Sequence, residues 1–282
     1  MKIIECPRDA MQGIENFIPT ADKIRYLNQL MKVGFDTIDA GSFVSPKAIP
    51  QLRDTAEVMN HIEFGVSQTK LLAIVANLRG AQEASLHDSV HYLGFPLSLS
   101  ETFQKRNTNQ SIPDALNTLN DIQEVCVRTG KTLVTYISMG FGNPYGDPYD
   151  LDVAGKFVDI LSSLEIRIVS LADTIGVSKP GQIRYLFTHL TSDFPAMELG
   201  VHLHSNPATS IEKIEAAVEA GCRRFDGAIR GFGGCPMAED DLVGNLATET
   251  VLSYLDLKGI DTKLDRGEFA KAMKLADDIF AA

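Results

Sequence analysis

The 282-residue sequence has no tryptophan, only four cysteines and no long uninterrupted apolar run. The cysteines form neither a C-x-x-C pair nor a regular framework, so we expect reduced thiols and a cytoplasmic protein. No apolar stretch approaches the ~18 residues that span a bilayer, and the first residues lack the apolar core of a signal peptide. These absences argue against a disulfide-stabilised secreted protein and against a membrane protein.

Basic residues are also fewer than acidic residues. The chain has 26 lysines and arginines against 37 aspartates and glutamates, a net charge of −11. We therefore expect neither nucleic acid nor an anionic membrane surface as a partner, although a local basic patch could still hold an anionic ligand. The 44% of hydrophobic and 22% of charged residues are typical of a globular protein.

Short apolar runs alternate with longer segments of helical periodicity along the whole chain. We expect strands at residues 3–6, 35–40, 71–76, 89–93, 132–138, 166–171, 198–204 and 224–229. We expect helices at residues 22–33, 51–61, 78–86, 111–129, 151–163, 183–193, 208–220, 242–257 and 266–280. Eight alternations in a chain of this length predict an α/β fold, a (β/α)₈ TIM barrel formed as one domain over residues 1–282. The last helix is expected to pack on the barrel as an addition.

Some local signals refine this outline. Thr20 and Ser111 are each placed to cap the helix that follows. The polar segment 98–110 follows the fourth strand, and its basic residues Lys105 and Arg106 suggest a functional loop.

The segment Glu198–His204 predicts a strand that carries two imidazoles on one face. Side chains two apart point to the same side of a strand, so His202 and His204 share a face and three apolar residues occupy the other. Two neutral imidazoles form half of a site for a divalent metal. The alternative is a pair of hydrogen-bonded structural histidines near a strand end.

Polar residues gather at the expected carboxyl ends of the strands, where TIM barrels place their chemistry. Asp9 is the best third metal ligand, although it could instead cap a turn. Asn245 offers a neutral oxygen, or it caps the following helix. Two imidazoles, a carboxylate and an amide oxygen suit Mg²⁺ or Mn²⁺ better than Zn²⁺, with positions left for substrate oxygens.

Four further residues at these strand ends are candidates for the chemistry. Arg8 is permanently charged and can fork onto carboxylate or enolate oxygens, or it forms a surface ion pair. Asp39 and Asp173 can orient water, ligands or Arg8, or they cap turns. Cys235 lies in the glycine-rich segment 231–236, which suits a loop that closes over a site, but a buried structural cysteine is the default.

Six short motifs together resemble the 3-hydroxy-3-methylglutaryl-CoA lyase family, which is related to Claisen-condensing synthases. They span nearly the whole chain and are PRDAMQ (7–12), SFVSPK (42–47), DTIG (173–176), H-x-H (202–204), GFGGCP (231–236) and GNLATE (244–249). The resemblance implies a metal-dependent TIM-barrel lyase that splits 3-hydroxy-3-methylglutaryl-CoA, or a close 3-hydroxy-acyl-CoA, into acetoacetate and acetyl-CoA. It also implies a homodimer or small homo-oligomer, acting in leucine degradation or another acyl-CoA route.

The family's roles carry over where the motifs match. The implied metal ligands are Asp9, His202, His204 and Asn245. The implied catalytic residues are Arg8, which stabilises an enolate, Cys235 and the position of Asp39, and we add Asp173 as a catalytic candidate from its place at a strand end. We expect Arg8, Gln12, Ser42 and Lys47 to bind substrate, with Lys105 and Arg106 as further candidates for the CoA phosphates.

Two departures from the family pattern bear on the substrate. Asp39 stands where the family usually has glutamate, so its carboxylate is one methylene shorter. After His204 the family tends to have Asp-Thr-x-Gly-x-Ala, whereas this chain has Ser-Asn-Pro-Ala-Thr at 205–209.

Three other functions compete with the lyase. A Claisen-condensing acyl-CoA synthase and a 4-hydroxy-2-oxo acid aldolase belong to the same superfamily and share the Arg-Asp and His-x-His elements. A barrel that binds metal or acyl-CoA without catalysis is the third, and only the altered segment 205–209 favours it.

Overall fold

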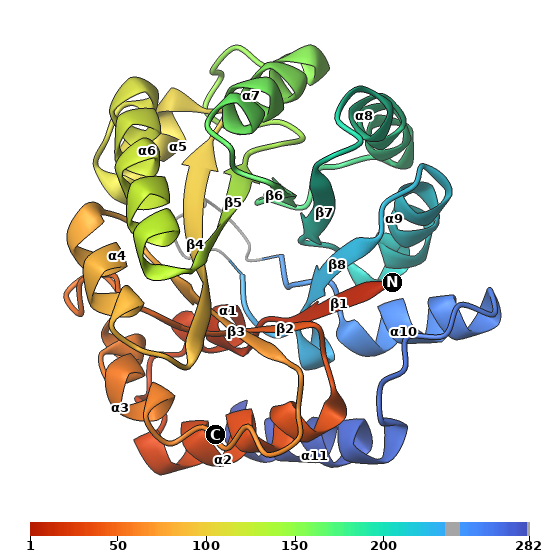
Figure 1. Ribbon diagram of the computed structural model, residues 1–282. Helices are drawn as coiled ribbons and strands as arrows, with labels where there is room; N and C mark the ends of the chain where they lie inside the picture. The colour runs from red at the N-terminus through yellow and green to blue at the C-terminus, as the bar shows by residue number, and fades with distance from the viewer. Residues whose placement is uncertain (235–242, 281–282) are drawn as a thin grey trace.

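The computed structural model describes residues 1–234 and 243–280, which form a closed barrel of parallel strands surrounded by helices (Figure 1). Neighbouring strands follow each other in chain order, and β1 closes the ring by pairing with β8. The strands are β1 Lys2–Glu5, β2 Thr37–Ser42, β3 Lys70–Ile74, β4 Val90–Ser98, β5 Thr132–Ser138, β6 Ile168–Asp173, β7 Glu198–Leu203 and β8 Arg224–Gly227. This arrangement confirms the (β/α)₈ barrel expected from the sequence.

Helices follow each strand and cover the outside of the barrel (Figure 1). They are α1 Pro7–Gln12, α2 Thr20–Val33, η1 Pro50–Leu52, α3 Thr55–Met59, α4 Leu78–Ser85, α5 Glu101–Thr108, α6 Ile112–Thr129, α7 Leu151–Ser163, α8 Pro180–Asp193, α9 Pro207–Glu219, η2 Ile229–Gly231, α10 Thr248–Leu257 and α11 Arg266–Phe280. In the described ranges, no helix combines the length and apolar character needed to cross a bilayer.

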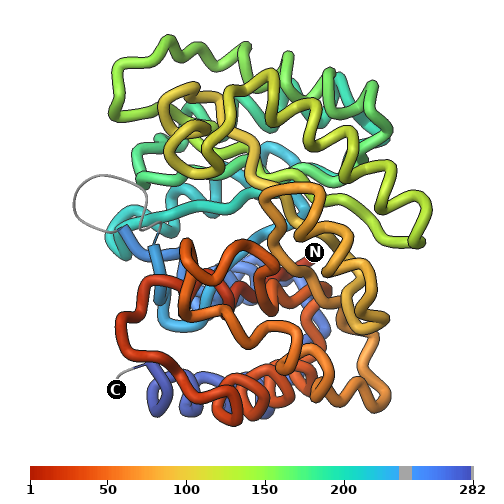
Figure 2. The backbone as a smooth tube through the Cα atoms, turned by 90° about the vertical axis from the view of Figure 1, so that its left-hand side faces the viewer, coloured from red at the N-terminus to blue at the C-terminus, as the bar shows by residue number. Residues whose placement is uncertain are grey.

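The last helix, α11, lies alongside α2 on the outside of the barrel in both views (Figures 1 and 2). The rings of Tyr26 and Phe280 meet edge to face with centroids 5.2 Å apart, and Gln29 donates hydrogen bonds to Glu268. The C-terminal helix is therefore an addition packed on the barrel, as expected.

The two faces of the strands have different partners. Leu71 and Ala73 of β3 belong to the large core that the helices cover, whereas Leu72 and Ile74 belong to a second, smaller cluster. Because side chains alternate along a strand, this smaller cluster lies inside the barrel. It is Leu72, Ile74, Tyr92, Val134, Tyr136 and Ile168, so strands β3 to β6 make the apolar side of the interior.

The structure corrects the expected loop at 98–110, which contains helix α5. Strand β4 continues to Ser98, and Ser100 then caps α5 by accepting a hydrogen bond from the backbone N–H of Phe103. Asp147 stabilises this start by accepting bonds from the Ser100 and Thr102 hydroxyls. The helix is short and strongly polar, so it lacks the apolar periodicity by which the other helices were predicted. Only its capping residues identify it, which is why the sequence pattern indicated a loop.

Two further expected helices differ in extent. The helix expected at 51–61 is divided into η1 and α3, because Thr55 bonds to the carbonyl of Leu52 and to the N–H of Ser42 instead of continuing one helix. The helix expected at 242–257 begins only at Thr248, since the residues just before it pair with strand ends. Residue 242 lies outside the described residues.

Of the two residues expected to cap helices, Ser111 does so and Thr20 does not. Thr20 is not a cap, because α2 begins at this residue and its hydroxyl bonds to Asp54. Ser111 does cap α6 by accepting a bond from the N–H of Asp114.

Glu5 connects the first strand to the last part of the barrel. Its carboxylate is wholly buried, and it accepts hydrogen bonds from the N–H of Ile229 at 2.8 Å and from the Thr248 hydroxyl at 2.6 Å. Burial raises the pKa of Glu5 from 4.5 to about 8, although these two bonds act in the opposite direction. The folded protein therefore retains a proton in this pH range that the unfolded chain releases.

This retained proton predicts a pH-dependent stability. Because the native state binds the additional proton, the free energy of unfolding should fall as pH rises from 4.5 to about 8. Glu5→Gln should flatten this dependence and raise the free energy of unfolding at the upper end by on the order of 3 kcal/mol. Urea unfolding of the metal-free protein across this range measures both slopes. Equal slopes for the two proteins would contradict the protonated state of Glu5.

Candidate active site

A cavity of about 160 Å³ opens at the carboxyl ends of the barrel strands. Its wall contains both polar and apolar residues. The polar residues include Arg8, Asp9, Gln12, His202 and His204. The apolar and aromatic residues include Val44, Ile49, Ile74, Pro96, Phe103 and Tyr136. Five of the residues singled out from the sequence thus share one cavity.

Asp9, His202 and His204 converge at this cavity. One possible ligand atom from each lies within 4.8 Å of the other two, and Asp9 Oδ2 is 3.9 Å from His202 Nε2. All three side chains are buried. Asp9 comes from α1, just after the first strand, whereas the histidines come from the end of β7. Closure of the barrel therefore brings together residues almost 200 positions apart.

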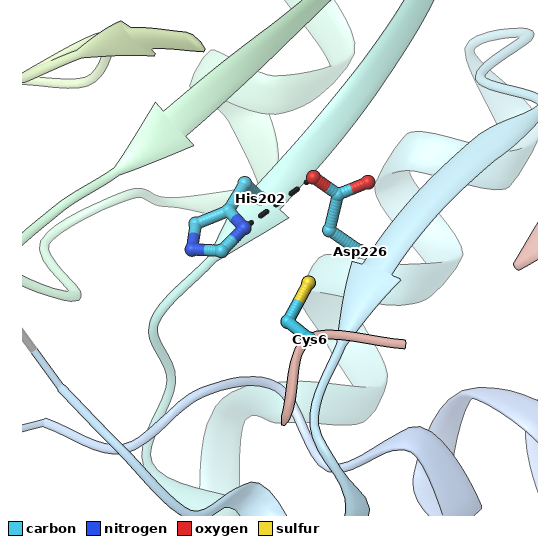
Figure 3. Close-up of side chains that lie close together, drawn as sticks. All are labelled: Cys6, His202 and Asp226. Atoms are coloured by element: carbon cyan, nitrogen blue, oxygen red, sulfur yellow. Dashed lines mark ion pairs between the residues drawn. The ribbon is translucent and has the colours of Figure 1, made fainter. Parts of the chain in front are cut away.

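The hydrogen-bond partners of the histidines leave both Nε2 atoms available. His204 Nδ1 lies 2.9 Å from the carbonyl oxygen of Val243, and a carbonyl can only accept, so Nδ1 carries the proton. His202 Nδ1 faces Asp226, with Oδ2 3.4 Å away (Figure 3). Metal-binding histidines usually donate the second ring N–H in this way. The chemistry of these residues therefore fits a divalent metal.

The electrostatics of Asp9 and His204 also fit a cation. Burial acts to raise the pKa of Asp9, but Arg8 and the two histidines outweigh it and hold the pKa at about 2. Burial and the neighbouring His202 lower the pKa of His204, which favours the neutral imidazole that a metal requires. Burial also acts to lower the pKa of His202, but the carboxylates of Asp226 and Asp9 outweigh it and raise the pKa.

Asn245 lies beside the three candidate ligands. Its Nδ2 donates to Asp9 Oδ2 at 2.6 Å and to the carbonyl oxygen of Phe232 at 2.8 Å. The helix-cap alternative is wrong, because the residue at the N-cap of α10 is Ala247. The amide presents its nitrogen to Asp9, so a ligand role for its oxygen remains a prediction.

Arg8 lies beside Asp9 and is held by hydrogen bonds from three of its nitrogen atoms. Its Nε and Nη2 donate to Asp39 Oδ2 at 2.9 and 2.6 Å, and its Nη1 donates to Asp9 and to Gln12, each at 2.9 Å. The side chain is buried, so the surface ion pair considered as an alternative is wrong. Burial acts to lower the pKa of Arg8, but the two carboxylates outweigh it and raise the pKa, so the guanidinium stays charged.

The contacts of Asp39 and Asp173 differ. Asp39 is wholly buried and orients Arg8, one of the roles expected for it. Asp173 accepts bonds from the N–H groups of Val177 and Ser178 and forms an ion pair with Lys213 at 3.3 Å. These contacts match the turn-capping alternative. The neighbours of Asp173 in the chain, and not Asp173 itself, are among the residues of the cavity wall.

The remaining candidates are Ser42, Lys47 and Cys235. Ser42 is buried, and its hydroxyl accepts a bond from the N–H of Val44, so it shapes the cavity through its neighbour. Lys47 is exposed and is not part of the described wall. Cys235 lies outside the described residues.

The sequence reasoning missed several residues of the site. Phe103 and Asn107 line the cavity from α5, and their i, i+4 spacing was a usable signal within the segment interpreted as a loop. Arg224 and Asp226 are buried charged residues two apart on β8. Charged residues at inward positions of a buried strand are costly and indicate a specific role, so these two could also have been found.

Comparisons with known proteins agree with this geometry. A family model described as HMGL-like matches residues 2–276. The chain is 33% identical over 274 residues to the hydroxymethylglutaryl-CoA lyase YngG of Bacillus subtilis, covering 96% of this chain and 90% of that protein. It is 36% identical over 259 residues to a 3-hydroxy-3-isohexenylglutaryl-CoA/hydroxy-methylglutaryl-CoA lyase of Pseudomonas aeruginosa, covering 92% and 85%.

Solved structures give the same result. The structure of an HMG-CoA lyase from Acinetobacter baumannii in complex with coenzyme A and 3-methylmalate matches with a TM-score of 0.92 at 30% identity, covering 100% of this chain and 91% of that one. The resemblance drawn from six short motifs is thereby confirmed, and the chain belongs to the HMGL-like family.

Proposed function

We propose that this protein is a metal-dependent carbon–carbon lyase that cleaves 3-hydroxy-3-methylglutaryl-CoA, or a close 3-hydroxy-acyl-CoA, to acetoacetate and acetyl-CoA. One observation carries the proposal: Asp9, His202 and His204 converge beside a buried, charged Arg8 in one cavity. The lyase names of the relatives support the same reaction.

The proposed metal site consists of Asp9, His202 and His204, with Asn245 as a fourth ligand once its oxygen faces the ion. We propose Mg²⁺ or Mn²⁺, because carboxylate and amide oxygens prefer these ions. When bound, the ion would supply Lewis-acid polarisation of the substrate's oxygens.

The chain's own residues account for the charge that the reaction creates. When the C3 hydroxyl loses its proton, its oxygen forms the ketone of acetoacetate as the C2–C3 bond breaks. The electron pair of that bond passes to the thioester as an enolate, which is then protonated to acetyl-CoA. Arg8 meets the enolate oxygen, and Asp39 and Gln12 hold the guanidinium in place. Such preorganised donors are typically worth ~10²–10³ in rate each. Asp39, His202 and Cys235 remain the candidates for moving protons, and we also retain Asp173 as a proposed catalytic residue.

We propose that basic residues at the rim bind the CoA phosphates. Lys47 is exposed in the segment after β2, and Lys105 and Arg106 lie in the last turn of α5, whose Phe103 lines the cavity. The relative from A. baumannii was solved with coenzyme A, which supports an acyl-CoA substrate. Ser42 would contribute by fixing the loop that follows it.

The decisive assay offers the purified chain three alternative sets of substrates in the presence of Mg²⁺ or Mn²⁺, with products identified by mass spectrometry. We expect acetoacetate and acetyl-CoA from 3-hydroxy-3-methylglutaryl-CoA, and no product from acetyl-CoA plus a 2-oxo acid or from a 4-hydroxy-2-oxo acid. Turnover of acetyl-CoA with a 2-oxo acid alone would support the synthase, and turnover of the 4-hydroxy-2-oxo acid alone would support the aldolase. Binding of the acyl-CoA without turnover would support the non-catalytic barrel.

We also propose that residues 1–282 form one domain and that the protein is a cytoplasmic homodimer or small homo-oligomer, on the basis of the family resemblance. Light scattering tests the oligomer, and a single cooperative unfolding transition tests the single domain.

A further inference from the structure

His202 belongs to two groups of possible ligands at once. Its Nε2 side faces Asp9 and His204, whereas its Nδ1 side faces Asp226 and the thiol of Cys6 (Figure 3). In each group, the candidate atoms lie within 4.8 Å of one another. We call the group Cys6, His202 and Asp226 the lower group. A single imidazole cannot serve both groups equally, so the environment of Asp226 decides which nitrogen carries the proton.

Asp226 is buried next to a buried arginine. Its exposed fraction is 1%, its Oδ2 accepts a hydrogen bond from the Ser170 hydroxyl at 3.2 Å, and its Oδ1 is 3.8 Å from Arg224 Nε. Gly200 of β7 makes room for this arginine, since a Cβ at Gly200 would lie 2.8 Å from the Arg224 side chain. Arg224 Nη1 in turn donates to Glu198 at 3.0 Å. A line of alternating charge thus runs from Glu198 through Arg224 and Asp226 to His202.

The position of the lower group argues against a metal ion there that acts on a substrate. Neither Cys6 nor Asp226 is part of the described cavity wall, so a substrate in the cavity would not reach an ion bound there.

His202 Nδ1, in contrast, needs a partner. It is buried and has no hydrogen bond of ordinary geometry within the described residues, and Asp226 Oδ2 lies 3.4 Å from it. Buried ring N–H groups are rarely left without an acceptor. Strand pairing puts His202 directly opposite Asp226, so the backbone fixes this contact.

We propose that Asp226, backed by Arg224, is a positioning residue that keeps the proton of His202 on Nδ1 and turns Nε2 toward Asp9. This proposal rests on the proposed function in one respect, because it assumes that the metal binds between Asp9 and the two histidines. Carboxylates in this position orient a ligand imidazole and raise its basicity, and their loss weakens metal binding by ~10–100-fold.

The test compares Asp226→Asn, which retains size and a neutral acceptor, with Asp226→Leu, which removes the acceptor. Calorimetric titration of each folded variant with Mn²⁺ should give a Kd about 10-fold higher for the asparagine variant and about 100-fold higher for the leucine variant. Nitrogen NMR of histidine-labelled, metal-free protein in mildly alkaline buffer reports the tautomer directly. We expect the His202 proton on Nδ1 in the wild type and a shift toward Nε2 in Asp226→Leu, with assignment from His202→Gln.

Cys6→Ser is the matched control, because it changes the lower group without touching Asp226. Its Mn²⁺ affinity should equal that of the wild type, and a clear loss would place the metal in the lower group and overturn the proposal. The proposal would also be overturned if a folded Asp226 variant kept the wild-type tautomer of His202 and bound Mn²⁺ with a Kd within about threefold of the wild-type value. A wild-type protein that binds no Mn²⁺ would instead contradict the proposed function.

Discussion

Replacing Arg8 by lysine is expected to lower kcat for the cleavage by about 10²–10³ while the protein stays folded and retains its metal. Lysine keeps the positive charge but loses the planar fork that reaches Asp39 and Asp9 at the same time. Its ammonium can neutralise the buried carboxylates without presenting a fixed donor to the enolate. Steady-state kinetics together with metal analysis of the purified variant measures both parts of the expectation.

Lysine is a better choice here than an uncharged residue. Removing the charge from Arg8 would leave the buried carboxylates of Asp9 and Asp39 without the guanidinium that compensates their charge, and such losses typically cost ~3–5 kcal/mol of stability. Arg184→Lys is the matched control, since Arg184 pairs with Glu219 on the surface at 2.8 Å. If Arg8→Lys kept the turnover of Arg184→Lys, Arg8 would have no role in stabilising the enolate.

His204→Ala is expected to lose stoichiometric metal and, with it, all measurable cleavage. The variant removes one of the three groups that share the proposed ion, so the Mn²⁺ affinity should fall by more than ~100-fold, beyond the effect of losing a supporting residue. Titration with Mn²⁺ followed by electron paramagnetic resonance counts the bound ion. Far-ultraviolet circular dichroism checks that the barrel still forms.

His189→Ala serves as the control for this experiment. His189 is exposed on α8 and bonds to the carbonyl oxygen of Tyr185, far from the cavity wall. It should bind Mn²⁺ as the wild type does. Full metal occupancy in His204→Ala would remove His204 from the ligand set and leave His202 and Asp9 without the expected third group.

The barrel could be predicted from the sequence because the same pattern, a short apolar run followed by a segment of helical periodicity, occurs eight times. Each strand is a short apolar run, and the alternation with helices predicts parallel pairing without any knowledge of contacts. The positions that escaped prediction are those where polar contacts replace apolar periodicity. Helix α5 is held by Ser100 and Asp147, and the helix expected at 51–61 is interrupted by Thr55, so side-chain hydrogen bonds decided both.

The residues of the site could be predicted as far as the positions of the strand ends could be predicted. Asp9, His202 and His204 were placed at one rim by counting strands, and their convergence follows from barrel closure. The partners of these groups were not predictable, because they depend on packing across the barrel. Asp226 reaches His202 from the neighbouring strand, and Asp173 bonds to its own loop and to Lys213. A sequence pattern gives the position of such a carboxylate but not its neighbour.

The most direct test of the account is anomalous X-ray diffraction from crystals of the protein grown with Mn²⁺. We predict one strong peak within ~2.0–2.4 Å of a carboxylate oxygen of Asp9 and of both histidine Nε2 atoms. A main peak beside Cys6 and Asp226, or none near His202 and His204 at saturating Mn²⁺, would contradict the metal site on which the proposed cleavage depends.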